Sequence, residues 1–358
     1  MKPFYYWLDP LRALSALAVL ICHTQCVCFG YYPELEEAYR GIPAQLLFFL
    51  GAQGISAVAI FFILSGFLVG GRTLEKIKIR KISAKQFAID RIFRIGVPLV
   101  GAVLLILIVN SIIGVPNEPL QIIGQFFGLQ GTFVKDYGGV FWTMAYEIWF
   151  YVILFGIILM VLNRKEKNIL IGFGVLLLAF SIYGMLNCEW TFVILLGILA
   201  FKLKDIKLNP NIKYGSLILS FIFYALYFCS RTNFGTSFYY TTTKFKPFHM
   251  ILCYGFLSIF ISQIVYSKPV NTISKWFEKI GNFFAKFSYS LFLTHYQVLK
   301  FHIAYGQEYH VLNFQTLSYY LILLVVALVV AYIFYYIFER NTKKIQNFFC
   351  NKVNFLRA

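Results

Sequence analysis

The sequence predicts an all-α, polytopic membrane protein with about ten transmembrane helices and both termini in the cytoplasm. Composition is the first reason. Of 358 residues, 59% are hydrophobic and only 13% are charged, and the mean hydropathy is +0.71. A soluble domain carries roughly a quarter charged residues, so this chain needs lipid around much of its surface. The spacing of its apolar runs and the placement of its basic residues are the other two reasons.

The apolar runs have the length of membrane-spanning helices. A helix needs about 20 mostly apolar residues to cross the hydrocarbon core. The sequence contains ten such segments, of which the sixth is short: 11–29, 45–70, 95–115, 140–162, 168–186, 190–203, 214–230, 248–266, 286–303 and 316–338.

The basic residues follow the alternation that ten spans require. With the N-terminus inside, 25 of the 32 Lys and Arg residues fall in cytoplasmic segments, six fall in outside loops and Arg12 lies in the first span. The outside loop 231–248 is the weakest point because it holds three of the six. This asymmetry is the positive-inside bias. The net charge of +17 is therefore a topology signal and an attraction to anionic lipid rather than a sign of nucleic-acid binding.

The loops are too short to form a separate domain. The longest have about 20 to 25 residues, which cannot bury a core. We therefore predict a single integral-membrane domain over 1–358 with no appended soluble domain. The seven cysteines lie mostly in apolar runs and lack metal-binding spacing, so no metal site is expected. Function must then be carried by the helices and their short loops.

Four ionisable residues inside predicted spans stand out: Arg12, His23, Glu147 and His295. Charged groups are costly there and indicate a functional site. Arg12 and His23 are eleven residues apart, which places them on one helix face about 16 Å apart along the axis. Glu147 must be protonated, paired with a cation or in contact with water. The histidines titrate near neutral pH. The alternative for each histidine is a purely structural role.

Two further segments contain candidate binding residues. In "FFILSGFLVGGR", Ser65 and Gly66 interrupt an apolar helix, and small residues let a ligand or another helix approach the backbone. In "RIFRIGVP", Arg91 and Arg94 stand three apart on one helical face. Two guanidinium groups there can clamp phosphates. The alternatives are plain helix packing for the first segment and contact with lipid headgroups for the second.

Five motifs in order resemble the acyltransferase family 3 of integral-membrane O-acyltransferases. They are "LRALSALAVLICHT", "FFILSGFLVG", "RIFRIGVP", "FWTMAYEIWFY" and "FSYSLFLTHYQVL". Two details depart from the family pattern. Pro98 comes four residues after Arg94 rather than three, and "FERNTKK" has Asn341 where a proline is usual.

The resemblance implies transfer of an acyl group, usually acetyl, from cytoplasmic acyl-CoA to a hydroxyl. The acceptor would be a sugar of a surface polysaccharide, lipopolysaccharide or lipid-linked glycan. The protein would be a multi-pass protein of the bacterial plasma membrane. Catalysis would then fall to His23, Arg12 and Glu147.

The same resemblance suggests where the substrates bind. Arg91, Arg94, Ser65 and Gly66 would hold acetyl-CoA as the acyl donor. Trp142, Tyr146 and His295 would contact the acceptor, with core packing as the alternative for the two aromatic residues.

A proton-coupled small-molecule transporter is the alternative function. Buried Arg, Glu and His in ten helices also fit that class. Transporters of this kind often contain internal repeats, and no convincing repeat occurs in the sequence. A phosphate-clamping loop also has no natural role in a transporter, so the sequence favours the enzyme.

Overall fold

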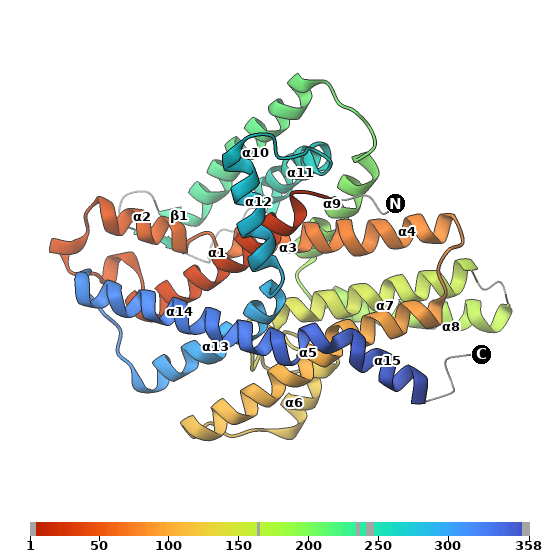
Figure 1. The fold of residues 1–358 in the computed structure, drawn as a ribbon, viewed down its shortest axis with the longest axis horizontal. Helices are drawn as coiled ribbons and strands as arrows, with labels where there is room; N and C mark the ends of the chain where they lie inside the picture. Colours follow the sequence, from red (N-terminus) through yellow and green to blue (C-terminus); the bar gives the residue numbers. More distant parts are fainter. Residues whose placement is uncertain (1–4, 163–164, 234–236, 241–246, 353–358) are drawn as a thin grey trace. The chain divides into compact units, whose positions relative to one another are not determined.

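The computed structural model describes residues 5–162, 165–233, 237–240 and 247–352, and these are almost entirely helical (Figure 1). A short antiparallel pair, β1 (Thr232–Asn233) and β2 (Ser237–Tyr240), is the exception. The helices are α1 (Leu8–Phe29), η1 (Tyr32–Glu34), η2 (Glu37–Tyr39), α2 (Ile42–Gly51), α3 (Gly54–Ser65), η3 (Gly66–Gly71), α4 (Arg72–Lys78), α5 (Ala84–Ile113), α6 (Pro119–Phe126), α7 (Trp142–Leu162), α8 (Glu166–Gly184), α9 (Cys188–Leu203), α10 (Pro210–Arg231), α11 (Pro247–Ile264), α12 (Thr272–Ala285), α13 (Ser288–Tyr305), α14 (Phe314–Ile337), η5 (Glu339–Asn341) and α15 (Thr342–Lys352).

Each of the ten predicted spans coincides with helix, which confirms the all-α prediction. Seven helices within the described residues are long and apolar enough to cross a membrane. The count of ten and the cytoplasmic termini stay predictions. The second span differs in detail, because the chain turns at Ala52 and Gln53 between α2 and α3. Among the basic residues counted for topology, Lys2, Arg164, Lys244, Lys246 and Arg357 lie outside the described residues.

Four α-helices lie in segments that were predicted as loops: α4, α6, α12 and α15. Each is shorter than a span. Helix α12 begins at Asn271, whose side chain accepts a hydrogen bond from the Ser274 amide at 2.8 Å, a common N-cap arrangement. Helix α12 buries Gly281 and Ala285 and exposes Trp276. A search for long apolar runs misses such amphipathic helices.

The chain divides into two compact units. Unit 1 comprises residues 1–72, 189–289 and 302–326, and unit 2 comprises residues 73–188, 290–301 and 327–358. Helices α13 and α14 contribute residues to both. The prediction of one functional domain over 1–358 stays a prediction.

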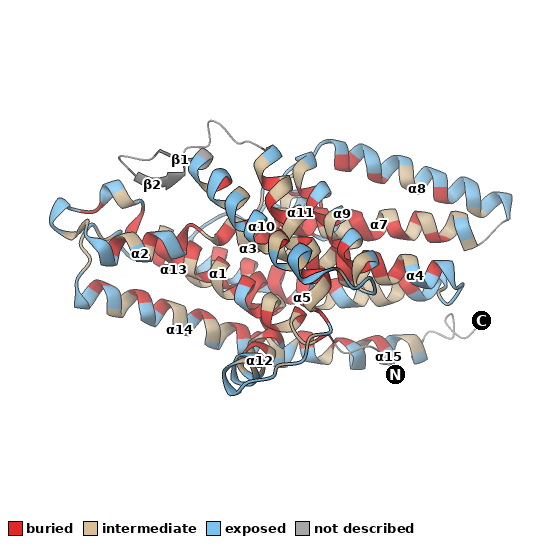
Figure 2. Cartoon of the chain, turned by 90° about the horizontal axis from the view of Figure 1, so that it is seen from above, coloured by how far each residue is buried: buried red, intermediate tan, exposed pale blue. Residues whose placement is uncertain are grey.

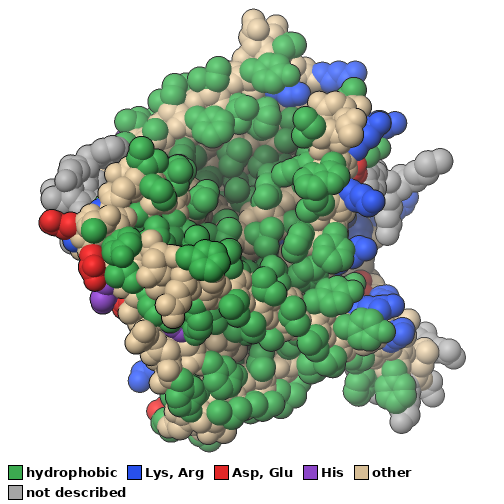
Figure 3. All heavy atoms as spheres, turned by 60° about the vertical axis from the view of Figure 1, so that its left-hand side comes forward, with side chains coloured by type: hydrophobic (Ala, Val, Ile, Leu, Met, Phe, Trp, Pro, Cys, Tyr) green, Lys and Arg blue, Asp and Glu red, His purple; other side chains and the backbone are tan. Residues whose placement is uncertain are grey.

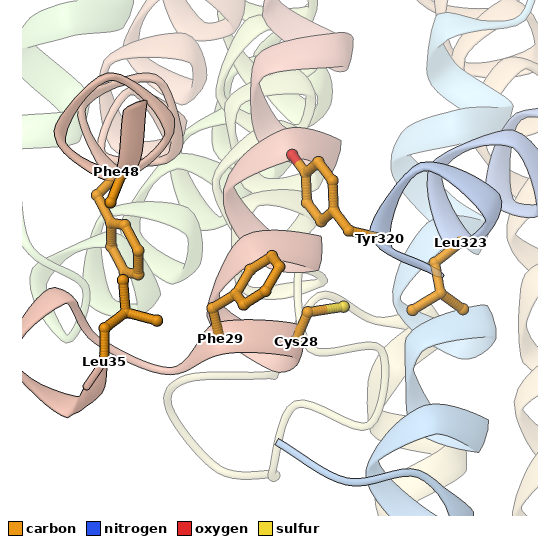
Figure 4. Packing of buried hydrophobic residues seen from close by; sticks show 7 residues of the cluster. Cys28, Phe29, Leu35, Phe48, Tyr320 and Leu323 are labelled. Carbon is orange, nitrogen blue, oxygen red and sulfur yellow. The ribbon is translucent and has the colours of Figure 1, made fainter. Parts of the chain in front are cut away.

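In unit 1, α1 packs against α2, α3 and α12, and α10 packs against α11. One end of α1 lies in an apolar cluster that also draws on α2 and α14. Phe29, Leu35 and Phe48 converge there beside Tyr320 (Figure 4). The Phe29 and Tyr320 ring centroids are 5.8 Å apart, within the usual range for aromatic pairs. This packing fixes the C-terminal end of the helix that carries Arg12 and His23.

In unit 2, α7 packs along α8, and α5 packs against α7 and α15 (Figure 1). Helix α5 begins at Ser83, whose hydroxyl accepts a hydrogen bond from the Gln86 amide at 3.1 Å. It ends at Gly114, which has a left-handed φ of 76°, the usual glycine stop. The 30 residues between include both arginines of "RIFRIGVP".

Many exposed side chains are large and apolar. Helices α8 and α14 are mostly exposed or half-buried along their length (Figure 2), and hydrophobic side chains cover most of the face in Figure 3. Leu170 is 70% exposed and Val325 is 57% exposed. Such surfaces are unfavourable in water and are what a lipid-facing helix presents.

Candidate functional site

Arg12 and His23 lie on the same continuous helix, α1, in unit 1. Arg12 forms an ion pair with Asp9 at 2.8 Å, three residues earlier in the first turn. Its guanidinium charge is therefore partly balanced by its own helix. His23 is half-buried between the buried residues Cys22 and Thr24. The catalytic roles of the two residues stay predictions.

Ser65 and Gly66 mark a change of helix type. The helix α3 continues at Gly66 into η3, a π-helix that extends to Gly71. Such insertions are rare and frequently occur at functional sites. Gly66 packs directly on α9: a Cβ at Gly66 would overlap the Ile194 carbonyl oxygen and lie 3.0 Å from the Gly197 Cα. This face of Gly66 is occupied by a neighbouring helix, as the packing alternative predicts.

Ser65 has a buried hydroxyl with no hydrogen-bond partner within the described part of the chain. An unpaired polar group that is buried beside a π-helix is unfavourable, so its presence calls for an explanation such as contact with a ligand. The predicted contact of Ser65 and Gly66 with a donor stays a prediction.

Arg91 and Glu147 meet through a residue that the sequence analysis did not single out, Tyr151. The Tyr151 hydroxyl donates a hydrogen bond to the Glu147 carboxylate, four residues earlier on α7. The Arg91 guanidinium lies over the Tyr151 ring, with Cζ 5.3 Å from the centroid, and also interacts with its hydroxyl. The (i, i+4) spacing of Glu147 and Tyr151 is the signal that identifies this pair.

Arg94 binds a different acidic residue, Glu339 in η5. The two side chains approach to 3.7 Å. The Glu339 carboxylate also accepts hydrogen bonds from the backbone amide and hydroxyl of Ser290, at 3.2 Å and 2.7 Å. Glu339 is buried, whereas the Arg94 side chain is 54% exposed. Arg94 therefore keeps donors facing outward while one carboxylate orients it. No local sequence pattern predicts this contact.

Trp142 and Tyr146 lie in the first turns of α7. Their rings meet edge to face with centroids 6.1 Å apart. Tyr146 is buried, and its hydroxyl donates to the Asn187 carbonyl at 3.2 Å. Its own carbonyl accepts a hydrogen bond from Tyr183 on α8 at 2.8 Å. Tyr146 thus joins α7 to α8, and its predicted contact with an acceptor stays a prediction.

His295 is buried on α13 at 1% exposure. Its Nδ1 lies 2.8 Å from the Leu291 carbonyl oxygen. A carbonyl oxygen only accepts, so Nδ1 carries the proton in the neutral ring. The other nitrogen, Nε2, is then the basic one. This arrangement suits a proton-handling histidine, and that role stays a prediction.

Unit 2 has polar clusters at two positions along α5 and α13. At the arginine end, Arg94 of α5 and Ser290 of α13 meet at Glu339. At the lysine end, Lys300 of α13 donates to Asn110 of α5 at 3.2 Å. Both helices therefore run from the first end to the second. His295 lies midway along α13, five residues from each of Ser290 and Lys300.

Asp136 helps to build the lysine end. Its carboxylate accepts backbone hydrogen bonds from Gly138 and Trp142, each at 2.9 Å. Burial raises the pKa of Asp136, and hydrogen bonds from the amides of residues 138, 139, 141 and 142 act in the opposite direction. This carboxylate fixes the loop that leads into α7. Asp136 is not among the residues predicted for the site. Lys300 lies within α13, as the predicted span 286–303 implies.

The fold and these residues define a class: a helical membrane protein with polar groups buried among its apolar helices. Within the described residues, no three His, Cys, Asp or Glu side chains are grouped to hold a metal ion.

The family model of acyltransferase family 3, described as an acyltransferase domain, matches residues 5–336, and the chain belongs to this family. The resemblance drawn from the five motifs is thereby confirmed, and membership favours the acyltransferase over the transporter. No curated protein and no solved structure is significantly similar to the chain.

Proposed function

We propose that the protein is a membrane-bound O-acetyltransferase. It moves an acetyl group from acetyl-CoA to a sugar hydroxyl of a surface polysaccharide, lipopolysaccharide or lipid-linked glycan, in the plasma membrane of a bacterium. Beyond family membership, the observation that best supports this proposal is the contact of Tyr151 with both Arg91 and Glu147. It joins a cation suited to the donor's phosphates to a carboxylate within the helix.

The arginine end of unit 2 is the proposed donor site. Arg94 is half-exposed and has five N–H donors, so its ion pair with Glu339 leaves donors for a phosphate. The Nε of Arg91 is buried and has no hydrogen-bond partner within the described residues. Phosphate oxygens accept from guanidinium groups in bidentate geometry, which suits the diphosphate of a coenzyme A molecule. Ser65 and Gly66 are the residues proposed to contact the slim pantetheine arm, as the family resemblance implies.

His23 is the proposed general base. It takes the proton from the acceptor hydroxyl as the oxygen attacks the thioester carbonyl. A C–O bond forms, the C–S bond breaks, and the coenzyme A thiolate leaves and receives the proton. In a variant of this route His23 carries the acyl group itself before the hydroxyl attacks. Arg12 stabilises the oxyanion that develops on the carbonyl. Glu147 orients a histidine or balances a cation, with Tyr151 fixing its carboxylate.

The acceptor is assigned to the neighbourhood of His295, Trp142 and Tyr146. Aromatic faces suit the apolar faces of sugar rings, and a buried histidine can hand a proton to or from a hydroxyl. These roles rest on the residue types and the family, with α13 and α7 supplying the positions.

Substitution of His23 tests the proposal. Membranes containing the full-length protein are supplied with radiolabelled acetyl-CoA and with membrane glycans as acceptors. Wild type should transfer label, and His23→Ala should lose transfer by at least a hundredfold while reaching the membrane in equal amount. His310→Ala, which removes an exposed loop histidine, is the matched control. Full activity in His23→Ala would remove this histidine from the mechanism, and no transfer by wild type would refute the function.

A further inference from the structure

Two side chains on one face of α13 reach the same short loop at the lysine end of unit 2. Gln297 and Lys300 are three residues apart, which makes them neighbours on a helix. The Gln297 Nε2 lies 3.5 Å from the Gly138 carbonyl oxygen. The Lys300 ammonium donates to the adjacent Tyr137 carbonyl at 2.8 Å. Consecutive carbonyls of the loop therefore hold the two side chains side by side.

Each side chain has hydrogen-bonding capacity that remains unused. The Gln297 side chain is 1% exposed, and its Oε1 has no hydrogen-bond partner within the described part of the chain. A buried, unpaired amide oxygen is unfavourable and calls for an explanation. The Lys300 ammonium has three donors. Two are directed to Tyr137 and Asn110. One acceptor on Gln297 and one donor on Lys300 are thus left on neighbouring side chains of α13.

The loop beneath this pair is built to hold its shape. Asp136 accepts the amides of Gly138 and Trp142, so the loop folds back on its own carboxylate. Gly139 has a φ of 74° and packs so closely on the Tyr296 ring that a Cβ would overlap it. Only glycine fits readily at such a position. The carbonyls that orient Gln297 and Lys300 are therefore fixed by the loop and not by the ligand.

The chemistry of the pair selects a neutral hydroxyl. A hydroxyl both donates and accepts, so it can donate to Gln297 Oε1 while accepting from Lys300 Nζ. An ionised carboxylate or phosphate presents only acceptors. It has no proton to donate to the glutamine oxygen, so two acceptors would face each other. The negative charge of Asp136 acts on the Lys300 ammonium, so it offsets the attraction of this cation for an anion. A sugar hydroxyl matches both groups.

We propose that Gln297 and Lys300 form a subsite that binds one hydroxyl of the acceptor sugar and thereby sets which sugars are acetylated. This inference rests on the proposed function and deepens it by naming specificity-determining residues. The subsite lies on the same helix as His295, less than two turns away. A site built to hydrogen-bond a substrate hydroxyl discriminates strongly against the analogue that lacks it.

A panel of methyl glycosides and their monodeoxy analogues tests the subsite, with radiolabelled acetyl-CoA as donor and the full-length protein in membranes. Gln297→Met and Lys300→Met should each raise the KM for the preferred glycoside at least tenfold and leave the KM for acetyl-CoA within twofold. Wild type should discriminate against one deoxy analogue at least tenfold. Both variants should lose that discrimination.

Two further variants separate binding from folding. Lys300→Arg keeps a cationic donor and should retain at least a third of the discrimination that Lys300→Met loses. Gln125→Met removes another buried glutamine whose Oε1 has no partner in the described residues, and it should leave both KM values within twofold. Thermal unfolding identifies a variant that fails to fold. If Gln297→Met fails, the variants of the half-exposed Lys300 test the subsite alone.

The outcomes distinguish this proposal from the function on which it rests. If wild type labels neither glycosides nor extracted membrane glycans, the proposed function fails. If wild type transfers label but both Met variants keep its acceptor KM and its discrimination, the function stands and the subsite is refuted. Equal loss in Gln125→Met and Gln297→Met would also refute the subsite, because the effect would then come from buried packing.

Discussion

The Tyr151 hydroxyl donates a hydrogen bond to the carboxylate of Glu147, one helical turn earlier on α7. Arg91 lies over the same tyrosine ring. One aromatic side chain therefore contacts both a predicted donor-binding cation and a predicted catalytic carboxylate. We therefore expect Tyr151 to position Glu147, and substitution of this tyrosine tests that expectation.

Tyr151→Phe should slow acetyl transfer roughly tenfold to a hundredfold. The ring and its contact with Arg91 remain, but Glu147 loses a hydrogen bond to a charged group, which contributes about 1.5–3 kcal/mol. The decrease should appear in kcat with the KM for acetyl-CoA within threefold. Tyr32→Phe removes a hydroxyl that donates to the Arg40 carbonyl at 2.8 Å and is the control. An unchanged kcat in Tyr151→Phe would show that the carboxylate needs no fixed orientation.

Glu339→Gln should lower the free energy of unfolding by about 1–3 kcal/mol. The carboxylate is buried, accepts two hydrogen bonds from Ser290 and faces Arg94. Removing its charge leaves the cation without its partner. Asp90→Asn is the control. Its ion-pair partner Lys343 is 70% exposed, such pairs contribute about 1 kcal/mol or less, and asparagine keeps an oxygen that accepts from Gln86 and Gln346. Thermal unfolding in detergent measures both, and equal shifts would contradict the prediction.

Gly66→Ala should destabilise the protein by about 1–3 kcal/mol. A Cβ at this position would overlap the Ile194 carbonyl and force η3 and α9 apart. Gly174→Ala is the matched control, because a Cβ at that helical glycine meets nothing within 4 Å. Alanine is the better helix former by about 1 kcal/mol, so the control should be stabilised. The two melting temperatures should move in opposite directions, and a tolerated Gly66→Ala would mean that the helices separate easily.

Glu308→Gln should stabilise the protein at alkaline pH and leave it unchanged in acid. Burial and the neighbouring Glu34 raise the pKa of Glu308, with His310 opposing. A folded-state pKa above the unfolded value means that stability falls as the pH rises through the folded pKa. Below about pH 4, where both states are protonated, the difference vanishes. Because Glu308 is exposed, the gain at pH 8 should be well under 1 kcal/mol.

Melting temperatures at pH 4, 6 and 8 test the sign of this effect. Tyr31 also faces both carboxylates, and burial with these charges raises the pKa of its phenol, so it stays neutral over this range. Glu37→Gln, whose partner Arg40 lies 3.9 Å away, should show no gain. A gain that is equal at pH 4 and pH 8 would rule out the charge of Glu308 as its cause.

Much of the fold could be predicted from the sequence because lipid imposes a simple rule. Every backbone polar group in hydrocarbon must be paired within its own segment, so long apolar runs become helices wherever they occur. All ten predicted spans are helical for this reason. The amphipathic helices α12 and α15 were not predicted, because such helices are recognised by the periodicity of their apolar residues rather than by the length of an apolar run. The five motifs were enough to predict the family, because family membership depends on residue types and their spacing along the chain.

The sequence by itself determined the class of protein, its helices and the residue types available for chemistry. The tertiary structure decided which of those residues meet. Arg91 reaches Tyr151 across two helices, Arg94 reaches Glu339 across more than 240 residues of chain, and Lys300 reaches Tyr137 and Asn110. Helix periodicity places side chains on a face but does not choose the neighbouring helix. That choice is made by packing among helices that are all similarly apolar.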